Sequence, residues 1–226
     1  MPDLAADLSL GCGNPTGFAD LSAGETVVDL GCGAGIDVIL AASKVGASGH
    51  VIGIDFAPAM IERARQAVEQ AALTGWDVQL VVGSIEDTGL PGEVADAVIS
   101  NCVINLTPDK KAVYREAFRI LKPGGRLAVS DILFAEHPAS DLEARLRASW
   151  YGCLGGAAVE GDYWETIRGE GFTEIEVVAR QALDAVGLKA IACCPGEDYS
   201  KAPSDEDLAV VQGKVLSVKF TAWKPL

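Results

Sequence analysis

The sequence contains little histidine and no long apolar stretch, and both absences narrow the possible functions. Its two histidines are His50 and His137, so we expect neither a histidine-based catalytic triad nor a histidine-based metal site. The apolar runs are far shorter than the roughly 20 residues of a membrane-spanning helix. The first residues, MPDLAAD, are acidic and lack the basic region that opens a signal peptide. We therefore expect a cytoplasmic chain without a membrane partner.

Basic residues are also scarce. The chain has 18 Lys and Arg against 32 Asp and Glu, which gives a formal net charge of −14. Proteins that bind nucleic acids or anionic membranes usually carry clusters of basic residues, and no such cluster stands out here. We expect no nucleic-acid partner, and a small neutral or electrophilic substrate fits the composition better.

The cysteines do not form the patterns of a zinc or disulfide scaffold. They are Cys12, Cys32, Cys102, Cys153, Cys193 and Cys194. No Cys-x-x-Cys pair occurs, which argues against zinc fingers and thioredoxin-like sites. The spacing is also too wide for a small disulfide-rich fold, and thiols in a cytosolic protein stay reduced.

Strand-like and helix-like segments alternate along the chain. The predicted strands are residues 26–30, 50–55, 78–82, 95–100 and 126–131, and the predicted helices are 35–44, 58–73 and 109–121. Helices near 140–150 and 161–170, strands near 174–179 and 215–223, and a loop at 193–207 follow. This order predicts an α/β fold with a doubly wound, mostly parallel sheet. We assign 1–135 to a cofactor-binding domain with an N-terminal cysteine loop, and 136–226 to a small substrate-binding extension that completes the sheet.

A glycine-rich turn follows the first predicted strand. In VVDLGCGAG, Gly31, Gly33 and Gly35 allow a tight turn and close approach of a ligand to the backbone. The spacing G-x-G-x-G differs from the G-x-G-x-x-G of dinucleotide sites. Asp29 precedes the turn, and its carboxylate suits a cationic group such as the amino group of S-adenosylmethionine (SAM). A glycine-rich turn alone is often a structural turn that binds no ligand.

Two further motifs follow the second and third strands. Asp55 ends the second strand and can accept the hydroxyls of a ribose. Phe56 and Met60 offer an apolar surface to an adenine, Ile85 can pack on the adenine, and Glu86 or its neighbours can accept a hydrogen bond from its exocyclic amine. Each residue alone could be an ordinary loop residue, but the ordered set falls on the sheet edge where such folds bind ligands.

These motifs resemble those of class I SAM-dependent methyltransferases. VVDLGCGAG is similar to their first motif, VIGIDFAPAM to their second, and LKPGGRLAVSD to a later strand, over roughly residues 24–135. The resemblance implies SAM as cofactor and a Rossmann-like, seven-stranded sheet in which the first and fourth strands are neighbours. It thereby places the loop after the fourth strand, with Asn101 and Cys102, beside the cofactor.

Two of the other cysteines are flanked by glycine, as Cys12 is in SLGCGNP and Cys153 is in WYGCLGG. Buried packing cysteines are common, but they usually lie among large apolar residues, whereas glycine-flanked cysteines can present their sulfur. We expect Cys32 to fill space within the glycine loop. The adjacent Cys193 and Cys194 are either a capture site that delivers a ligand or an incidental loop pair.

The cysteine segments resemble those of arsenite methyltransferases. LGCGNPTGFADL, SNCVINLTPDK and YGCLGGA are similar to their three cysteine loops, and the resemblance then covers about residues 9–180. It implies that Cys12, Cys102 and Cys153 are catalytic and bind As(III), a soft centre that suits thiolates. It further implies arsenite detoxification with a thiol reductant, thioredoxin or glutathione. The alternatives are a methyltransferase for a small organic acceptor, or a non-catalytic As(III)-binding relative.

Overall fold

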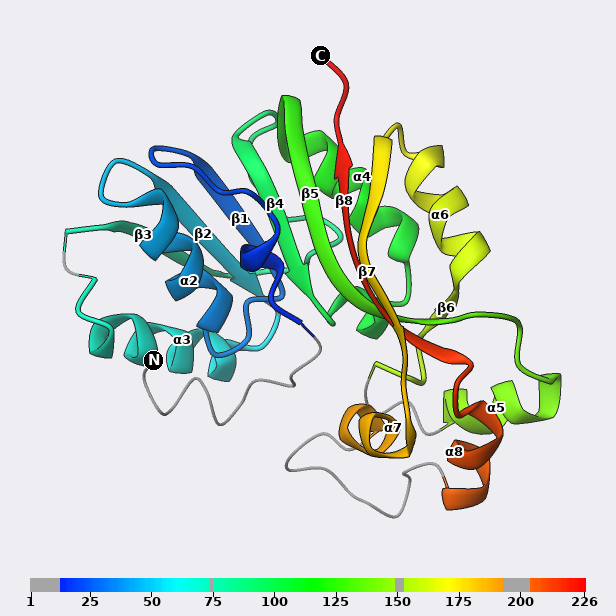
Figure 1. Cartoon of the computed structure of the whole chain (residues 1–226). Coiled ribbons are helices and arrows are strands. Elements are labelled where there is room, and N and C mark those ends of the chain that lie inside the picture. Colours follow the sequence, from blue (N-terminus) through cyan, green and yellow to red (C-terminus); the bar gives the residue numbers. More distant parts are fainter. Residues whose placement is uncertain (1–12, 74, 149–152, 193–203) are drawn as a thin grey trace.

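Eight strands form a single mixed sheet in the computed structural model, which describes residues 13–73, 75–148, 153–192 and 204–226. The strands are β1 (Thr26–Leu30), β2 (His50–Asp55), β3 (Asp77–Val82), β4 (Ala95–Asn101), β5 (Leu121–Phe134), β6 (Ala158–Val159), β7 (Thr173–Ala182) and β8 (Val215–Trp223). Their order is β3-β2-β1-β4-β5-β8-β7, with β6 paired to β5 (Figure 1). The pairs among β1 to β5 are parallel, whereas β8 is antiparallel to both β5 and β7.

Helices cover both faces of this sheet. They are α2 (Ile36–Val45), α3 (Pro58–Gln70), α4 (Lys110–Ile120), α5 (Ser140–Ala148), α6 (Glu160–Gly169), α7 (Ala185–Ala192) and α8 (Asp205–Val211), with short 3-10 turns η1 (Pro15–Gly17) and η2 (Ile104–Leu106). Side chains of β1 alternate between the two faces, as strand geometry requires. Val28 packs with residues of α4 and α6, and Val27 packs with residues of α2 and α3.

A third group of helices lies at the carboxyl end of β5. Leu142 of α5, Leu188 of α7 and Leu208 of α8 share one apolar cluster with Ile132 and Phe134 of β5. Figure 1 shows these three helices together, away from the two helical layers. The cluster also contains Cys102 and Cys153, so the C-terminal part of the chain packs around two of the predicted site residues.

The predicted fold class is confirmed, because seven strands lie along the main path of the sheet and β1 pairs with β4. Strand β6 is an addition that the sequence did not indicate. Strand β5 is longer than the predicted 126–131, because Lys122–Gly125 forms an irregularity between the pairs Ala95–Leu121 and Ala97–Arg126 instead of ending the pairing.

The prediction of a loop over residues 193–207 is wrong for its last residues. Helix α8 begins at Asp205, and the Ser204 hydroxyl oxygen accepts a hydrogen bond of 3.1 Å from the Asp207 amide. A serine cap followed by acids in the first turn is a recognised start of a helix. The turn-rich composition before it concealed this signal. Residues 193–203, with Cys193 and Cys194, lie outside the described residues.

The segment after Cys12 is fastened to the sheet by a buried arginine. Arg126 of β5 forms an ion pair of 2.7 Å with Glu25 and donates hydrogen bonds to the carbonyl oxygens of Ala19 and Asp20. Its guanidinium also lies over the Trp223 ring, 5.9 Å from the centroid. The planar, multidentate guanidinium suits this role. The chain from residue 19 to 25 therefore has a fixed place against β5.

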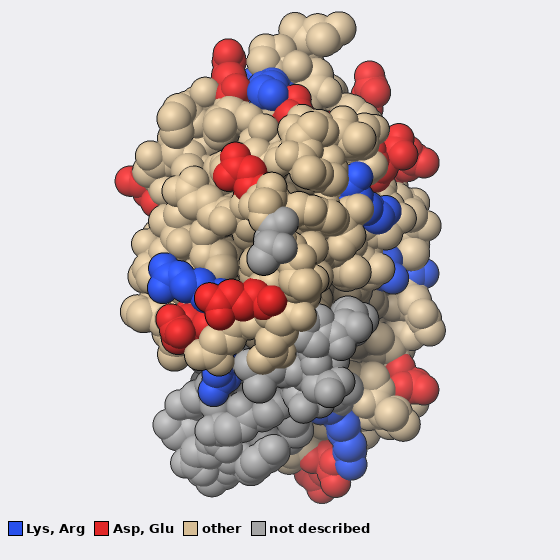
Figure 2. Space-filling view, turned by 90° about the vertical axis from the view of Figure 1, so that its left-hand side faces the viewer, with Lys and Arg blue, Asp and Glu red and all other residues tan. Residues whose placement is uncertain are grey.

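Charged side chains are spread over the surface seen in Figure 2, the side on which β3 lies in Figure 1. Lys and Arg there are interspersed with Asp and Glu instead of forming a continuous field. Within the described parts of the chain, no helix has the length and apolar character needed to cross a membrane.

Candidate active site

The glycine turn after β1 is joined to the loops after two other strands. Gly31 has φ +79°, and a Cβ added there would overlap the side chain of Val103, which follows Cys102. The Gly33 amide donates a hydrogen bond of 3.0 Å to Oδ2 of Asp55, and the Ala57 amide donates one of 2.9 Å to Oδ1. The predicted cofactor motifs of β1 and β2 are thus brought together, and the Cys102 loop packs directly on them.

Two buried carboxylates lie beside this turn, and the described residues pair neither of them with a basic side chain. Asp29 in β1 is 1% exposed, and burial, with Asp37 and Asp55 nearby, raises its pKa well above the ordinary value. Burial also raises the pKa of Asp37, which accepts a hydrogen bond of 3.0 Å from Asn101 Nδ2. Asp37 was missed in the sequence because an acid in the first turn of a helix is usually explained by the helix dipole.

Three oxygen atoms in this region lack a hydrogen-bond partner among the described residues. They are Oδ2 of Asp29, Oδ1 of Asp37 and Oδ1 of Asn101, and all three atoms are buried. Buried polar atoms are nearly always satisfied in folded proteins. A ligand with a cationic, multiply donating amino group would satisfy them and offset the charge of the two acids.

The remaining predicted cofactor residues surround the turn with different exposures. Phe56 is 75% exposed, whereas Ile85 is buried in the core beside Ile54. Met60 lies in the first turns of α3 and is half-buried. Glu86 is half-buried, and its Oε2 accepts a hydrogen bond of 3.1 Å from the Ser84 hydroxyl. Their contacts with a nucleoside stay predictions.

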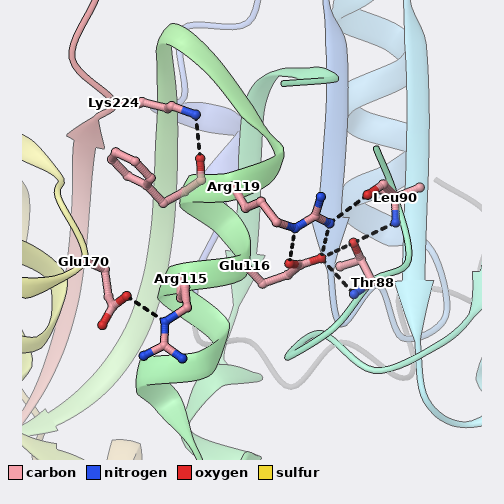
Figure 3. Close-up of polar contacts among 8 residues, drawn as sticks. Thr88, Leu90, Arg115, Glu116, Arg119, Glu170 and Lys224 are labelled. Atoms are coloured by element: carbon pink, nitrogen blue, oxygen red, sulfur yellow. Dashed lines mark hydrogen bonds and ion pairs between the residues drawn. The ribbon is translucent and has the colours of Figure 1, made fainter. Parts of the chain in front are cut away.

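The loop after β3, which carries Ile85 and Glu86, is fastened to α4 (Figure 3). Oε1 of Glu116 accepts hydrogen bonds from the hydroxyl and, at 2.9 Å, from the amide of Thr88. Arg119 bonds Glu116 at 2.7 Å and donates to the Leu90 carbonyl oxygen, also at 2.7 Å. Hydrogen bonds to charged groups are the stronger kind. Helix α4 therefore fixes one wall of the candidate cofactor site.

The three cysteine segments converge beside the glycine turn. Asn101 Nδ2 donates a hydrogen bond of 2.9 Å to the carbonyl oxygen of Gly13, the residue after Cys12. The Cys153 thiol donates one of 3.1 Å to the carbonyl oxygen of Cys102. Both Cys102 and Cys153 are buried. Cys102 has φ +58°, a conformation that costs a non-glycine residue energy and often marks a functional position.

The individual cysteines differ in their surroundings. Cys12 lies outside the described residues. Cys102 is disulfide-bonded, which differs from the expectation that the thiols stay reduced. Cys32 is buried in the separate cluster beneath α2 and α3, where it fills space. Within the described ranges, no group of three His, Cys, Asp or Glu side chains is placed to hold a metal ion.

A cavity of about 240 Å³ opens next to the Cys153 loop. Phe134, Leu154 and Gly156 line it, together with polar side chains such as Lys110 and His137. The Cys153 loop therefore borders solvent-accessible space on one side and Cys102 on the other.

These features define the class of protein. The chain belongs to the family described as "Methyltransferase domain", which it matches over residues 21–171, and its fold is that of class I SAM-dependent methyltransferases.

Among the individual relatives, arsenite methyltransferases stand out. The chain is 42% identical to the arsenite methyltransferase of Halobacterium salinarum, over 97% of this chain and 52% of that protein. It is 41% identical to the arsenite methyltransferase of Aquipseudomonas alcaligenes, over 71% of this chain and 47% of that protein. The crystal structure of an arsenic(III) SAM methyltransferase from Chlamydomonas reinhardtii superposes with a TM-score of 0.80 at 29% identity, covering all of this chain and 71% of that one. The chain thus spans about half the length of the curated relatives it matches.

Proposed function

We propose that this protein transfers a methyl group from SAM to trivalent arsenic held by Cys12, Cys102 and Cys153. The observation that carries the proposal is the convergence of the three cysteine segments on the glycine turn. The names of the relatives support the same activity, and the proposed outcome is detoxification of arsenite.

The residues around the glycine turn fit SAM. Its cationic amino group would satisfy the buried oxygen atoms of Asp29, Asp37 and Asn101. Gly31, Gly33 and Gly35 would let the cofactor approach the backbone. Asp55 and Glu86 would accept hydrogen bonds from the ribose and adenine, and Phe56, Met60 and Ile85 would supply apolar surface. When bound, SAM supplies a methyl group on a positively charged sulfonium.

The cysteines would hold arsenic so that its lone pair points at the methyl carbon. Soft thiolates suit this soft centre. A general base is not required, because arsenic bound by thiolates carries no proton to remove. Cys102 and Cys153 are 4% and 2% exposed, so their surroundings exclude competing water. The contribution of the protein is therefore alignment of the reacting atoms.

A reductant is part of the proposal. Cys102 is disulfide-bonded, and a thiolate, not a disulfide, is the ligand for arsenic. Thioredoxin or glutathione, in the cytoplasm where thiols stay reduced, would return the cysteines to the form that binds substrate. Neither a nucleic acid nor a membrane is needed as a partner.

The direct test is to incubate the protein with SAM, arsenite and a thiol and to detect methylated arsenic by chromatography with elemental mass spectrometry. The Cys102→Ser and Cys153→Ser variants are expected to lose turnover by about a thousand-fold or more, because removal of one member of a cooperating catalytic set is costly. SAM binding should stay within about two-fold of the wild type, since packing of similar side chains is kept.

Other outcomes would favour other functions. Serine variants that keep most methyl transfer to a small organic acceptor would indicate packing cysteines. Tight arsenite binding without transfer, insensitive to SAM, would indicate a non-catalytic relative. Absence of methylated arsenic from the fully reduced wild type would contradict the proposal.

A further inference from the structure

Asn105 lies just beyond Cys102, in η2, and the reaction proposed above gives its side chain no role. It is fully buried. Its Nδ2 donates a hydrogen bond of 2.7 Å to Oδ1 of Asp131 and one of 2.6 Å to the carbonyl oxygen of Ile132. An amide whose two donors are both bonded to one strand has little freedom to move. The Cys102 loop is thereby tied to the end of β5.

The anchor on β5 is itself held from a second element. Oδ1 of Asp131 also accepts a hydrogen bond of 3.0 Å from the Ile132 amide, and Oδ2 accepts one of 3.1 Å from the Tyr163 hydroxyl of α6. Tyr163 is buried beneath Trp164 and Phe220, with edge-on ring contacts to both. Asp131 therefore offers Asn105 a fixed point between the sheet and α6.

The backbone of Asn105 contacts the other cysteine loop. A Cβ added at Gly156, three residues after Cys153, would overlap the carbonyl oxygen of Asn105. The second contact between the loops is the hydrogen bond from the Cys153 thiol to the Cys102 carbonyl oxygen, 3.1 Å. The two loops thus touch at two points, and Asn105 forms one of them.

We infer that Asn105, anchored on Asp131, is a positioning residue that sets the spacing between the Cys102 and Cys153 loops. The inference rests on the proposed function, because arsenic is the ligand that these two sulfur atoms would share. A centre bound by several thiolates requires them at fixed distances, so displacement of one loop weakens every bond to it.

The same contacts separate arsenic binding from cofactor binding. The side-chain hydrogen bonds of Asn105 go to β5. The acids at the glycine turn are arranged by other groups, Asp37 by Asn101 and Asp55 by the amides of Gly33 and Ala57. Loss of the Asn105 side chain should therefore weaken arsenite binding and leave the affinity for SAM unchanged. A merely structural residue would move both.

The experiment uses the full chain, reduced with a phosphine that does not compete for arsenic as a thiol would. Arsenite binding is followed by thiolate–arsenic absorption in the near ultraviolet, and SAM binding by calorimetry. In Asn105→Ala we expect the Kd for arsenite to rise by about ten-fold or more, because the buried hydrogen bonds that tie the Cys102 loop to β5 are lost. In Gly156→Ala we expect a rise of similar size, because the added Cβ would overlap the Asn105 carbonyl oxygen and push the two loops apart. The Kd for SAM should stay within about two-fold of the wild type.

Ile120→Val is the matched control. Ile120 is fully buried at the end of α4. Its replacement by valine should lower the free energy of unfolding by an amount similar to that of Asn105→Ala, without moving a cysteine loop. Both affinities should stay at their wild-type values in this variant. Gly156→Ala keeps the bonds between Asn105 and Asp131, so it carries the test even where Asn105→Ala does not fold.

Each alternative result is informative. Unchanged arsenite binding in both variants would overturn the inference, and so would equal losses of arsenite and SAM binding, because they would mark a general loosening. A wild type that binds no arsenite would remove the proposed function and the inference together. A wild type that binds arsenite, with variants that match it, would remove the inference alone.

Discussion

Two buried carboxylates, Asp29 and Asp131, lie only a few strands apart but have opposite surroundings. Asp131 accepts hydrogen bonds from the Asn105 amide, the Ile132 amide and the Tyr163 hydroxyl. Asp29 has an oxygen without a partner among the described residues and two further acids nearby. The first is a structural anchor, and the second is arranged to receive a cation.

Replacement of Asp29 by asparagine should therefore weaken cofactor binding. We expect Asp29→Asn to raise the Kd for SAM by about thirty-fold, the equivalent of about 2 kcal/mol for one charge-assisted bond. Burial raises the pKa of Asp29. As the pH decreases, the wild type should therefore begin to lose affinity for SAM at a higher pH than it would with an ordinary aspartate at this position. Calorimetric titration with SAM measures both effects.

Asp96→Asn provides the control for this variant. Asp96 lies at the opposite end of β4 from Asn101, where it bonds the Thr26 amide and Lys122, both at 2.8 Å. Its loss should leave SAM binding unchanged. Equal affinity of the Asp29→Asn variant and the wild type would show that Asp29 does not face the amino group.

Asp131 should make stability depend on pH in an unusual direction. Burial raises its pKa from 3.8 to about 7, although the Ile132 amide, the Tyr163 hydroxyl and the charge of Lys110 oppose the shift. Between about pH 4 and pH 7 the folded chain keeps a proton that the unfolded chain releases. Rising pH therefore lowers the free energy of unfolding in this window, by about 4 kcal/mol in total from this group.

The measurement compares urea unfolding of the wild type and Asp131→Asn from about pH 4 to about pH 8. The variant loses hydrogen bonds at every pH. A constant difference in the free energy of unfolding between variant and wild type therefore says nothing about the ionisation of Asp131. Its stability relative to the wild type should rise through the window and then level off. Curves that stay parallel would show that Asp131 is ionised throughout.

At the scale of elements, α4 fixes the loop after β3 through Glu116 (Figure 3). Two hydrogen bonds from Thr88 to Glu116 and one from Arg119 to the Leu90 carbonyl oxygen join the helix to the loop. The ion pair between Glu116 and Arg119, both in α4, holds the carboxylate in place. We expect Glu116→Gln to lower the free energy of unfolding by about 1–3 kcal/mol and to weaken SAM binding as well, because the loop carrying Glu86 loses its anchor.

Glu170→Gln is a matched control for Glu116→Gln. Glu170 also pairs with an arginine of α4, at 3.1 Å from Arg115, but it touches the end of α6 instead of the cofactor loop. Unfolding and SAM titration of both variants distinguish the two roles. A cofactor affinity that falls equally in both, or in neither, would show that α4 does not position that loop.

Elements whose chemistry is local could be predicted from the sequence. Gly31 follows one short apolar strand and Asp55 ends the next, so the parallel topology alone brings them to one edge. Helix α8 could not be recognised in the same way, because its Ser204 cap follows a long turn-rich stretch. Strand β6 has two residues and no periodicity to recognise.

The roles of residues that depend on partners far away in the chain could not be predicted from the sequence. Asn105 and Asp131 are 26 positions apart, and nothing in their local motifs indicates that they meet. Asp37 was missed for the related reason that its environment comes from Asn101, 64 positions away. The convergence of Cys102 and Cys153 was expected only from a family resemblance, because the region around α5 follows no repeating pattern.

At the scale of the whole molecule, the C-terminal region is part of the core and not an appendage. Strand β8 pairs with β5 from Arg126–Trp223 to Phe134–Val215. Phe220 and Val218 of β8, with Tyr163 and Ile167 of α6, belong to the same apolar cluster as Val28 and Leu127. The division into 1–135 and 136–226 therefore remains a prediction about binding roles, and the two parts should not be separate folding units.

This sharing of the core gives a test by truncation. A chain of residues 1–135 would expose the inner edge of β5 and the apolar face that β8 and α6 cover, and an uncovered edge of this kind invites aggregation. We expect it to show no cooperative urea transition and no SAM binding, although every predicted cofactor residue is present in it. Removal of Pro225 and Leu226 alone, whose side chains are exposed, should leave both properties intact. If residues 1–135 unfold cooperatively and bind SAM, the cofactor half is an independent domain, and the C-terminal strands serve the substrate alone.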